Sequence, residues 1–239
     1  MEDEVLNIPN TPWQFSTTAI DNLGASEYTL VTIACDKSGS VSGFEAELIK
    51  ALNTVIDSCR KSPRAENILI RTVAFNHSQD ELHGFNELAK IKDYTQLDCE
   101  GATALFDSVY ASLGATIEYS KKLRSMDYSV NAIMFILTDG EDNRSTYGAS
   151  EIKKLVDQTL HSEEIGSVIT ILVGINDNGG LNSYLTNFKN NANLTQYVSL
   201  GDATAQRMAK LAGFVSQSIS SQSKSLASGT VANTSQLVF

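Results

Sequence analysis

The stretch "YTLVTIACDKSGS", residues 28–40, passes from a β-rich, mostly apolar run into one acid and a cluster of hydroxyls. An apolar run that does not alternate with polar residues is typical of a strand buried on both faces, as in a parallel sheet. Residues 68–75, 132–138 and 167–175 have the same character. The sequence therefore predicts a parallel sheet that is covered on both sides.

Helical patterns lie between these runs. Apolar residues recur every three or four positions from Phe44 to Cys59 and again from Leu105 to Ile117, and a further helix is predicted over residues 151–160. Ser42 and Glu45 have the spacing of a capping box, which predicts the start of the first helix.

The remaining elements complete an alternation of strands and helices. Residues 195–200 predict a last strand, and the apolar stripe over 208–219 predicts a last helix, with Asp202 as its candidate N-cap. A short edge strand is predicted at 82–85. Strands that alternate with helices form right-handed crossovers. We therefore expect an α/β fold with a doubly wound, mostly parallel open sheet, helices on both faces and one antiparallel edge strand.

The length of the chain, 239 residues with 42% hydrophobic content, is sufficient for one domain with a single core. We expect an N-terminal extension over 1–27, a central domain over 28–220 and a flexible, serine-rich tail over 221–239. Trp13 and Phe15 are expected to pin the extension to the domain, with an aromatic anchor for a partner as the alternative.

Charge and composition exclude several function classes. The net charge of −10 argues against nucleic acid, whose binding needs clustered Lys and Arg. No apolar run approaches the roughly 20 residues of a membrane helix, and the first residues lack the pattern of a secretory signal. The three cysteines are widely spaced, which fits neither a disulfide framework nor a zinc site. These features predict a cytoplasmic protein with neither nucleic-acid nor membrane partners.

Polar side chains follow the predicted strands. Asp36, Ser38 and Ser40 come after the first strand, Asp139 comes after the third, and Thr103 lies just before a helix. In an open α/β sheet the ligand crevice lies beyond the carboxyl ends of the strands, so these side chains are expected to meet. Two carboxylates and three hydroxyls form an all-oxygen donor set, which suits Mg²⁺, Mn²⁺ or Ca²⁺.

These residues resemble the metal-ion-dependent adhesion site (MIDAS) of von Willebrand factor A domains. "DKSGS" (36–40) matches the D-x-S-x-S signature, and Thr103 and Asp139 match the remaining threonine and aspartate. The resemblance covers about residues 28–220. The end of the chain is also similar to bacterial and phage members of the TerY type, which are associated with tellurite resistance.

The resemblance implies a role for each residue. Ser38 and Ser40 would bind the metal directly, Thr103 directly or through water, and Asp36 and Asp139 would hold coordinated waters and orient the serines. The expected cation is Mg²⁺, with Ca²⁺ or Mn²⁺ as alternatives. It would capture an Asp or Glu of another protein. The partner-binding rim would comprise Gly101, Ala102, Gly140, Glu141, Asp142 and Asn143.

Other interpretations of the same residues stay open. Each hydroxyl or carboxylate alone could belong to a turn or a helix cap, and only their joint placement favours a metal site. One alternative function is a structural subunit of a larger assembly that uses its termini or a sheet edge. Another is a metal-dependent phosphohydrolase. Resemblance to haloacid-dehalogenase-like phosphatases requires a general acid where this chain has Ser38, so a protein without enzymatic activity is expected.

Overall fold

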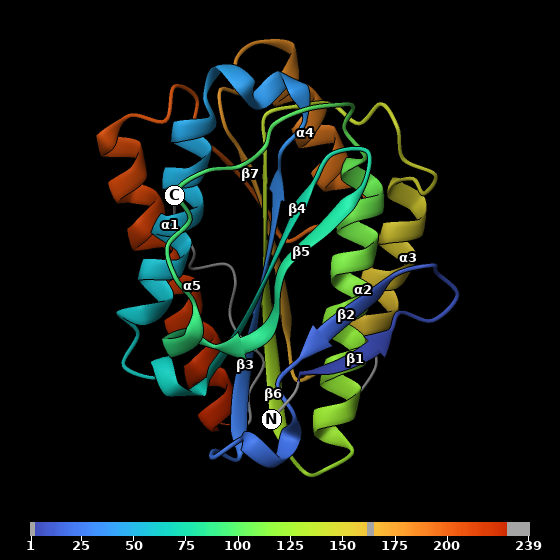
Figure 1. Cartoon of the computed structure of the whole chain (residues 1–239), viewed down its shortest axis with the longest axis vertical. Helices are drawn as coiled ribbons and strands as arrows, with labels where there is room; N and C mark the ends of the chain where they lie inside the picture. Colours follow the sequence, from blue (N-terminus) through green and yellow to red (C-terminus); the bar gives the residue numbers. More distant parts are fainter. Residues whose placement is uncertain (1–2, 162–164, 229–239) are drawn as a thin grey trace.

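The computed structural model describes residues 3–161 and 165–228, and it contains one sheet of eight strands between two layers of helices (Figure 1). The strand order is β1-β2-β5-β4-β3-β6-β7-β8, and β4, β3, β6, β7 and β8 run parallel. The strands are β1 (Glu4–Asn7), β2 (Gln14–Thr17), β3 (Glu27–Asp36), β4 (Ile68–Phe75), β5 (Gln79–Glu87), β6 (Ser129–Thr138), β7 (Val168–Gly174) and β8 (Gln196–Ser199). The predicted α/β class is confirmed.

The helices are divided between the two faces of the sheet (Figure 1). They are α1 (Glu45–Arg60) and α5 (Ala205–Ser228) on one face, and α2 (Leu105–Arg124), α3 (Ala149–His161) and α4 (Gly180–Asn191) on the other. A hydrophobic core lies on each face of the sheet. Successive side chains of a strand point to opposite faces, so β3 contributes to both cores: Ile33 packs beneath α1 and α5, and Leu30 beneath α2, α3 and α4. Within the described residues, none of these helices combines the length and the apolar character needed to cross a membrane.

The N-terminal extension joins the sheet. The predicted strand at 82–85 is present as the antiparallel β5, but β2 pairs with it, so the hairpin of β1 and β2 forms the outer edge instead. Phe15 is 1% exposed and meets Phe85 edge to face, with their ring centroids 6.2 Å apart. Phe15 therefore pins the extension to the sheet, as the sequence predicts.

The capping box predicted for the first helix is wrong. Ser42 lies in a 3-10 turn, Gly39–Gly43, and α1 begins at Glu45 without a side-chain cap. The Glu45 carboxylate accepts a hydrogen bond from the backbone N–H of Leu97 at 2.9 Å instead. The 3-10 turn that begins within the "DKSGS" stretch holds Ser42 away from the cap position, which Phe44 occupies.

Two other helices also differ from the prediction, α5 in its cap and α4 in being present at all. The Thr204 hydroxyl, and not Asp202, accepts a hydrogen bond from the Arg207 N–H (3.4 Å) at the start of α5, whereas the Asp202 carboxylate contacts Asn178. The helix α4 had no predicted counterpart. Its first turn contains glycine and asparagine, which indicate a loop when they are read locally.

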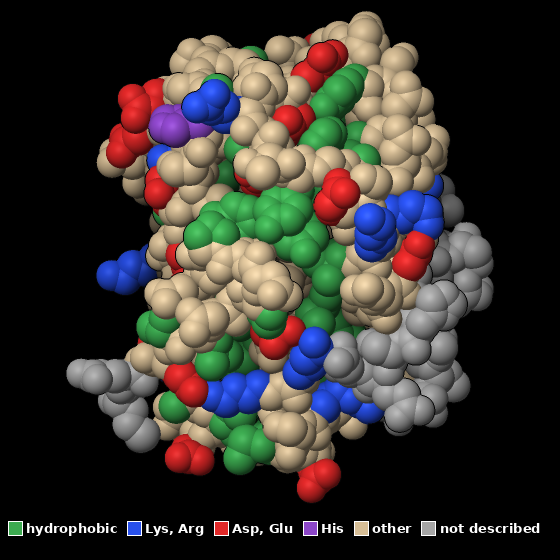
Figure 2. Space-filling model, turned by 90° about the vertical axis from the view of Figure 1, so that its right-hand side faces the viewer, with side chains coloured by type: hydrophobic (Ala, Val, Ile, Leu, Met, Phe, Trp, Pro, Cys, Tyr) green, Lys and Arg blue, Asp and Glu red, His purple; other side chains and the backbone are tan. Residues whose placement is uncertain are grey.

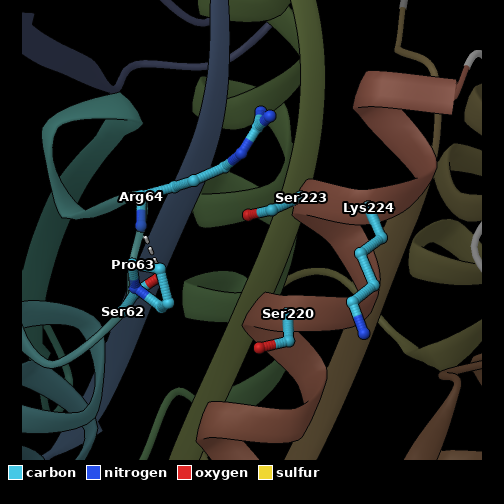
Figure 3. Close-up of a pocket in the computed structure, with 6 residues that line it drawn as sticks. All are labelled: Ser62, Pro63, Arg64, Ser220, Ser223 and Lys224. Atoms are coloured by element: carbon cyan, nitrogen blue, oxygen red, sulfur yellow. Dashed lines mark hydrogen bonds between the residues drawn. The ribbon is translucent and has the colours of Figure 1, made fainter.

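The last helix extends beyond the predicted domain boundary at residue 220. Gln222 is fully buried, and the Asn131 side-chain amide donates to its carbonyl at 3.0 Å, so α5 is held against β6 there. The rest of the predicted tail, 229–239, lies outside the described residues. A cavity of about 180 Å³ separates this part of α5 from the loop after α1 (Figure 3). Its lining residues are Ser62, Pro63, Arg64, Ser220, Ser223 and Lys224.

Candidate metal centre at the carboxyl edge of the sheet

The direction of winding reverses between β3 and β6. The chain moves from β3 through α1 to β4 on one side, and from β6 through α3 to β7 on the other. A crevice forms outside the carboxyl ends of the strands at such a reversal. Asp36 is the last residue of β3, and Asp139 directly follows the last residue of β6, so both carboxylates stand at this point.

A chain of hydrogen bonds joins four of the five predicted site residues. Asp36 Oδ1 accepts from the Ser38 N–H at 2.8 Å, the Ser38 and Ser40 hydroxyl oxygens lie 3.0 Å apart, and the Ser40 hydroxyl donates to Asp139 Oδ1 at 3.0 Å. The Thr138 hydroxyl donates to Asp36 Oδ2 at 2.6 Å and fixes the orientation of that carboxylate. The sequence analysis did not identify Thr138 as a site residue, because it belongs to the strand β6 and not to the loop after it.

The fifth residue, Thr103, faces the same space from a different loop. A Cβ atom placed on Gly140 would lie 3.5 Å from Ser40 Oγ, 3.6 Å from Thr103 Oγ1 and 3.8 Å from Asp36 Oδ2. Oxygens from the loop after β3, the loop before α2 and the end of β6 therefore surround one small volume. The structure brings all five predicted site residues together.

Backbone contacts hold the Thr103 loop in place. Gly101 has a φ of +78°, and a Cβ there would lie 2.5 Å from the His77 ring, so the position needs glycine. The Gly101 carbonyl accepts from the Gly39 N–H at 2.9 Å, which ties the loop to the "DKSGS" turn. The Thr103 N–H donates to Asn143 Oδ1 at 2.9 Å. The sequence analysis gave His77 no role, although this residue follows β4 and its ring borders the Thr103 loop.

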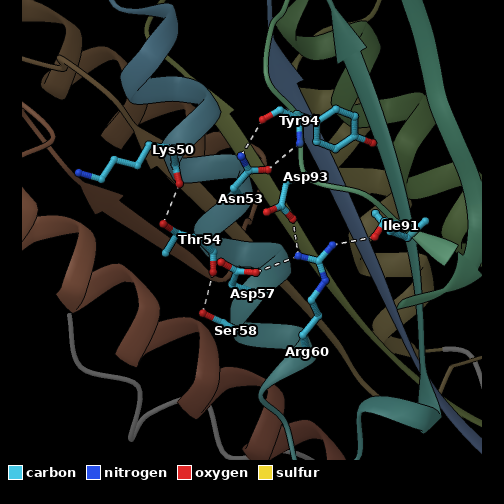
Figure 4. Close-up of polar contacts among 9 residues, drawn as sticks. All are labelled: Lys50, Asn53, Thr54, Asp57, Ser58, Arg60, Ile91, Asp93 and Tyr94. Atoms are coloured by element: carbon cyan, nitrogen blue, oxygen red, sulfur yellow. Dashed lines mark hydrogen bonds and ion pairs between the residues drawn. The ribbon is translucent and has the colours of Figure 1, made fainter. Parts of the chain in front are cut away.

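Helix α1 anchors the long segment that leads to Thr103 (Figure 4). The Asn53 side chain exchanges two hydrogen bonds with the Tyr94 backbone, at 2.8 and 3.0 Å. About two turns further on, the Arg60 guanidinium donates to the Ile91 carbonyl at 2.7 Å and pairs with Asp93. The segment has no regular secondary structure between residues 91 and 104, and these contacts substitute for it.

The residues of the predicted partner-binding rim differ in exposure. Gly101, Glu141 and Asn143 are exposed, and Ala102 and Gly140 are half-buried. Asp142 Oδ2 accepts from the Phe106 N–H at 3.0 Å and from the Ser145 hydroxyl, so its carboxylate caps the first turn of α2. No local pattern predicts this cap, because Asp142 lies 36 residues beyond the helix start that it serves.

Burial of two carboxylates dominates the electrostatics of the site. Burial raises the pKa of Asp36 above its usual value, and burial together with the Asp36 charge raises the pKa of Asp139 to about 6. Neither carboxylate forms an ion pair with a basic side chain among the described residues. Two neighbouring buried acids without a counter-charge disfavour their own ionised forms, and a bound cation would remove that penalty.

The donor set fits a hard cation that accepts neutral ligands. The described residues contain no group of three or more His, Cys, Asp or Glu side chains that could hold a metal ion. A cation here therefore depends on the hydroxyls of Ser38, Ser40 and Thr103, which suit Mg²⁺, Mn²⁺ or Ca²⁺.

Neither a protein-family model nor a curated protein matches this chain. Solved structures do. Proximal thread matrix protein 1 (PTMP1) from the mussel byssus is 17% identical with a TM-score of 0.53, over 81% of this chain and 46% of that one. A D319A mutant of the PilB minor pilin from Streptococcus sanguinis is 14% identical with a TM-score of 0.56, over 87% and 64%.

A further form of the mussel protein has a zinc-occupied MIDAS motif. It is 16% identical with a TM-score of 0.52, over 78% of this chain and 45% of that one. This chain thus spans about half the length of the mussel protein. At these identities the likeness concerns the fold, which is the Rossmann-like fold of von Willebrand factor A domains.

Proposed function

We propose that this chain is a metal-dependent protein-interaction module. Asp36, Ser38, Ser40, Thr103 and Asp139 would hold a divalent cation, with Mg²⁺ expected ahead of Ca²⁺ or Mn²⁺. The observation that carries the proposal is the convergence of five oxygen-bearing side chains on one crevice, with two buried carboxylates and no basic partner among the described residues. The zinc found in the MIDAS of the similar mussel protein supports a divalent cation.

The chemistry that the cation would supply is a positive centre for a carboxylate oxygen of the partner. The residues of the chain favour this use, because the proposed direct ligands Ser38, Ser40 and Thr103 are neutral and leave the cation able to bind an anionic ligand. Asp36 is already fixed by Thr138 and by the Ser38 N–H, so it orients the serines. The partner is therefore proposed to be a protein that presents an Asp or Glu side chain.

The charge of the exposed rim restricts which acidic partners can bind. Of its two acidic residues, only Glu141 is exposed, because Asp142 is engaged at the start of α2. One exposed carboxylate beside the crevice repels a purely acidic surface. We therefore propose a partner whose Asp or Glu is accompanied by a basic group that meets Glu141.

Two measurements test the proposal. Isothermal titration calorimetry with Mg²⁺ and Mn²⁺ compares the wild type with Ser38→Ala, and Ser42→Ala serves as the matched control because Ser42 is exposed on the same turn. We expect cation binding to be lost only in Ser38→Ala. A pull-down in Mg²⁺ and in EDTA then asks whether partner binding needs the cation. Equal retention of the partner in both conditions would show that the cation does not mediate the interaction.

A structural subunit of an assembly is the second candidate. The strand β1 is an outer edge of the sheet, and Val5 at its centre is 61% exposed, which suits strand addition by a neighbouring chain. In this case Val5→Lys should abolish assembly in analytical ultracentrifugation, whereas Ser38→Ala should not.

Catalysis is not part of the proposal, since Ser38 stands where a phosphatase of the haloacid-dehalogenase type needs an acid. Turnover of p-nitrophenyl phosphate with Mg²⁺ would contradict this. A cytoplasmic location is proposed from the three unpaired cysteines, and a setting like that of the TerY-type proteins is proposed from the resemblance of the last helix.

A further inference from the structure

Asn76 lies directly after β4, at the same edge of the sheet as the candidate metal centre. Its side chain is buried, at 2% exposure, whereas the next residue, His77, is exposed. This edge forms the upper end of the molecule in both overall views, and Figure 2 shows a histidine side chain at the surface there, close to acidic and basic side chains. A buried asparagine needs hydrogen-bond partners for both ends of its amide.

The two ends of the Asn76 amide have different partners. Its Oδ1 accepts from the Ser78 N–H at 2.9 Å and from the Ser78 hydroxyl at 3.0 Å, and its Nδ2 donates to the Glu100 carbonyl at 3.0 Å. Because a backbone N–H can only donate, Ser78 fixes the acceptor end of the amide, and the donor end must face Glu100. A carboxylate at this position would place a second acceptor against the Glu100 carbonyl.

The contacts of Asn76 enclose Thr103 from both sides along the chain. The Asn76 side chain holds Glu100, three residues before Thr103, and the Asn76 carbonyl accepts from the Ala104 N–H at 2.7 Å, one residue after Thr103. Thr103 itself is 3% exposed. Both ends of the loop that carries Thr103 are therefore fixed to the end of β4.

The other strand ends also hold this loop. The Glu100 N–H donates to the Lys37 carbonyl at 2.9 Å, in the turn after β3, and the Thr103 carbonyl accepts from the Asn143 N–H at 3.0 Å, in the loop after β6. Asn76 adds the contact with β4, the central strand between β3 and β5. The Thr103 hydroxyl is thereby given one position relative to Ser38 and Ser40.

A fixed hydroxyl matters more for one cation than for another. Mg²⁺ requires nearly ideal octahedral geometry with short metal–oxygen distances, whereas Ca²⁺ accepts six to eight oxygens in flexible geometry. Residues that orient metal ligands without touching the metal commonly change its affinity about 10- to 100-fold. Loss of the Asn76 contact with Glu100 should therefore affect Mg²⁺ more than Ca²⁺.

We propose that Asn76 is a positioning residue of the candidate metal centre, and that by fixing Thr103 it makes the centre favour Mg²⁺ over Ca²⁺. This inference rests on the proposed cation-binding function and adds to it the residue that sets the choice of cation. Asn76 acts through Thr103 and is not itself proposed as a metal ligand.

Isothermal titration calorimetry of the full chain with Mg²⁺ and with Ca²⁺ tests the proposal. We expect Asn76→Ala to weaken Mg²⁺ binding at least about tenfold and Ca²⁺ binding no more than about threefold. A general loss of structure would weaken the binding of both cations alike, so the ratio of the two affinities separates positioning from a merely structural role.

Asn67→Ala is the matched control. Asn67 lies directly before β4, and its Nδ2 donates to the Glu27 carbonyl at 3.0 Å at the opposite edge of the sheet. We expect this variant to bind both cations like the wild type. If Asn76→Ala fails to fold by circular dichroism, Asn76→Asp keeps the acceptor for Ser78 and loses the donor toward Glu100. Its added charge acts on both divalent cations, so the ratio of the affinities should fall in the same direction.

The outcomes distinguish this inference from the function on which it rests. Failure of the wild type to bind either cation would overturn both. If the wild type binds cations, the cation-binding function stands. Unchanged Mg²⁺ binding in a folded Asn76 variant, or equal weakening of Mg²⁺ and Ca²⁺ binding, would then overturn the positioning role alone.

Discussion

The Ser40 hydroxyl donates a 3.0 Å hydrogen bond to Asp139 Oδ1, although 99 positions separate the two residues. This contact joins the ends of two adjacent strands and closes the crevice between them. It also means that the metal ligands predicted from the sequence already contact one another in the folded chain.

Replacing either of the serines that we propose as direct metal ligands should abolish cation binding without unfolding the protein. Ser40 is exposed, and Ser40→Ala removes one hydroxyl while the backbone turn persists. We expect the Mg²⁺-dependent rise in melting temperature to disappear, with a fall in the free energy of unfolding of about 1–2 kcal/mol in EDTA because Asp139 loses a hydrogen-bond donor. Differential scanning calorimetry with and without Mg²⁺ measures both. An intact Mg²⁺ response in Ser40→Ala would remove this serine from the site.

Neutralising Asp139 should stabilise the metal-free protein. Asp139 is 8% exposed beside Asp36, and Asn keeps its shape while removing one of the two buried charges. We expect Asp139→Asn to increase the free energy of unfolding in EDTA by about 1–3 kcal/mol. The same variant should lose its response to Mg²⁺. Chemical denaturation in EDTA and in Mg²⁺ separates the effects, and destabilisation in EDTA would contradict the electrostatic account.

A methyl group at Gly140 should compete with the cation for space. The added Cβ would lie 3.5–3.8 Å from three of the site oxygens, in ordinary contact with them. The position has no positive φ, so Gly140→Ala causes no backbone strain. We expect cation affinity to fall at least about tenfold in titration calorimetry while the melting temperature in EDTA stays within a few degrees. Gly43→Ala, where nothing lies within 4 Å, is the control.

Asp142 should contribute to stability more than to binding. Its carboxylate caps the first turn of α2, and loss of a cap costs about 1 kcal/mol. We expect Asp142→Ala to lower the free energy of unfolding by about 1–2 kcal/mol, and the exposed Glu141→Ala to leave it unchanged within about 0.5 kcal/mol. Urea denaturation compares them. Equal stability of the two variants would show that the cap is dispensable.

Local patterns in the sequence were sufficient to predict the strands of the central sheet. The apolar run at 68–75 coincides with β4, and the run that ends before Asp36 became β3 with one residue added at each end. Such runs are informative because only a strand covered on both faces tolerates so few polar residues. The oxygen donors at the strand ends could also be recognised in the sequence, because they are polar residues directly after apolar runs.

Helix boundaries were the weaker part of the prediction. The expected caps at Ser42 and Asp202 failed because the path of the preceding loop decides which side chain reaches a free N–H. The cap of α2 comes from Asp142, and a partner 36 residues away leaves no local trace. The position of the N-terminal hairpin likewise depends on the contact between Phe15 and Phe85, which are distant in sequence.

The sequence by itself determined the class of fold, the order of the central elements and the five residues of the candidate metal centre, because periodicity and residue chemistry are local properties. Only the tertiary structure decided that Thr138 orients Asp36 and that Asp142 is engaged at a helix start. These facts depend on distances between segments far apart in the chain. Packing sets those distances, and no local pattern encodes them.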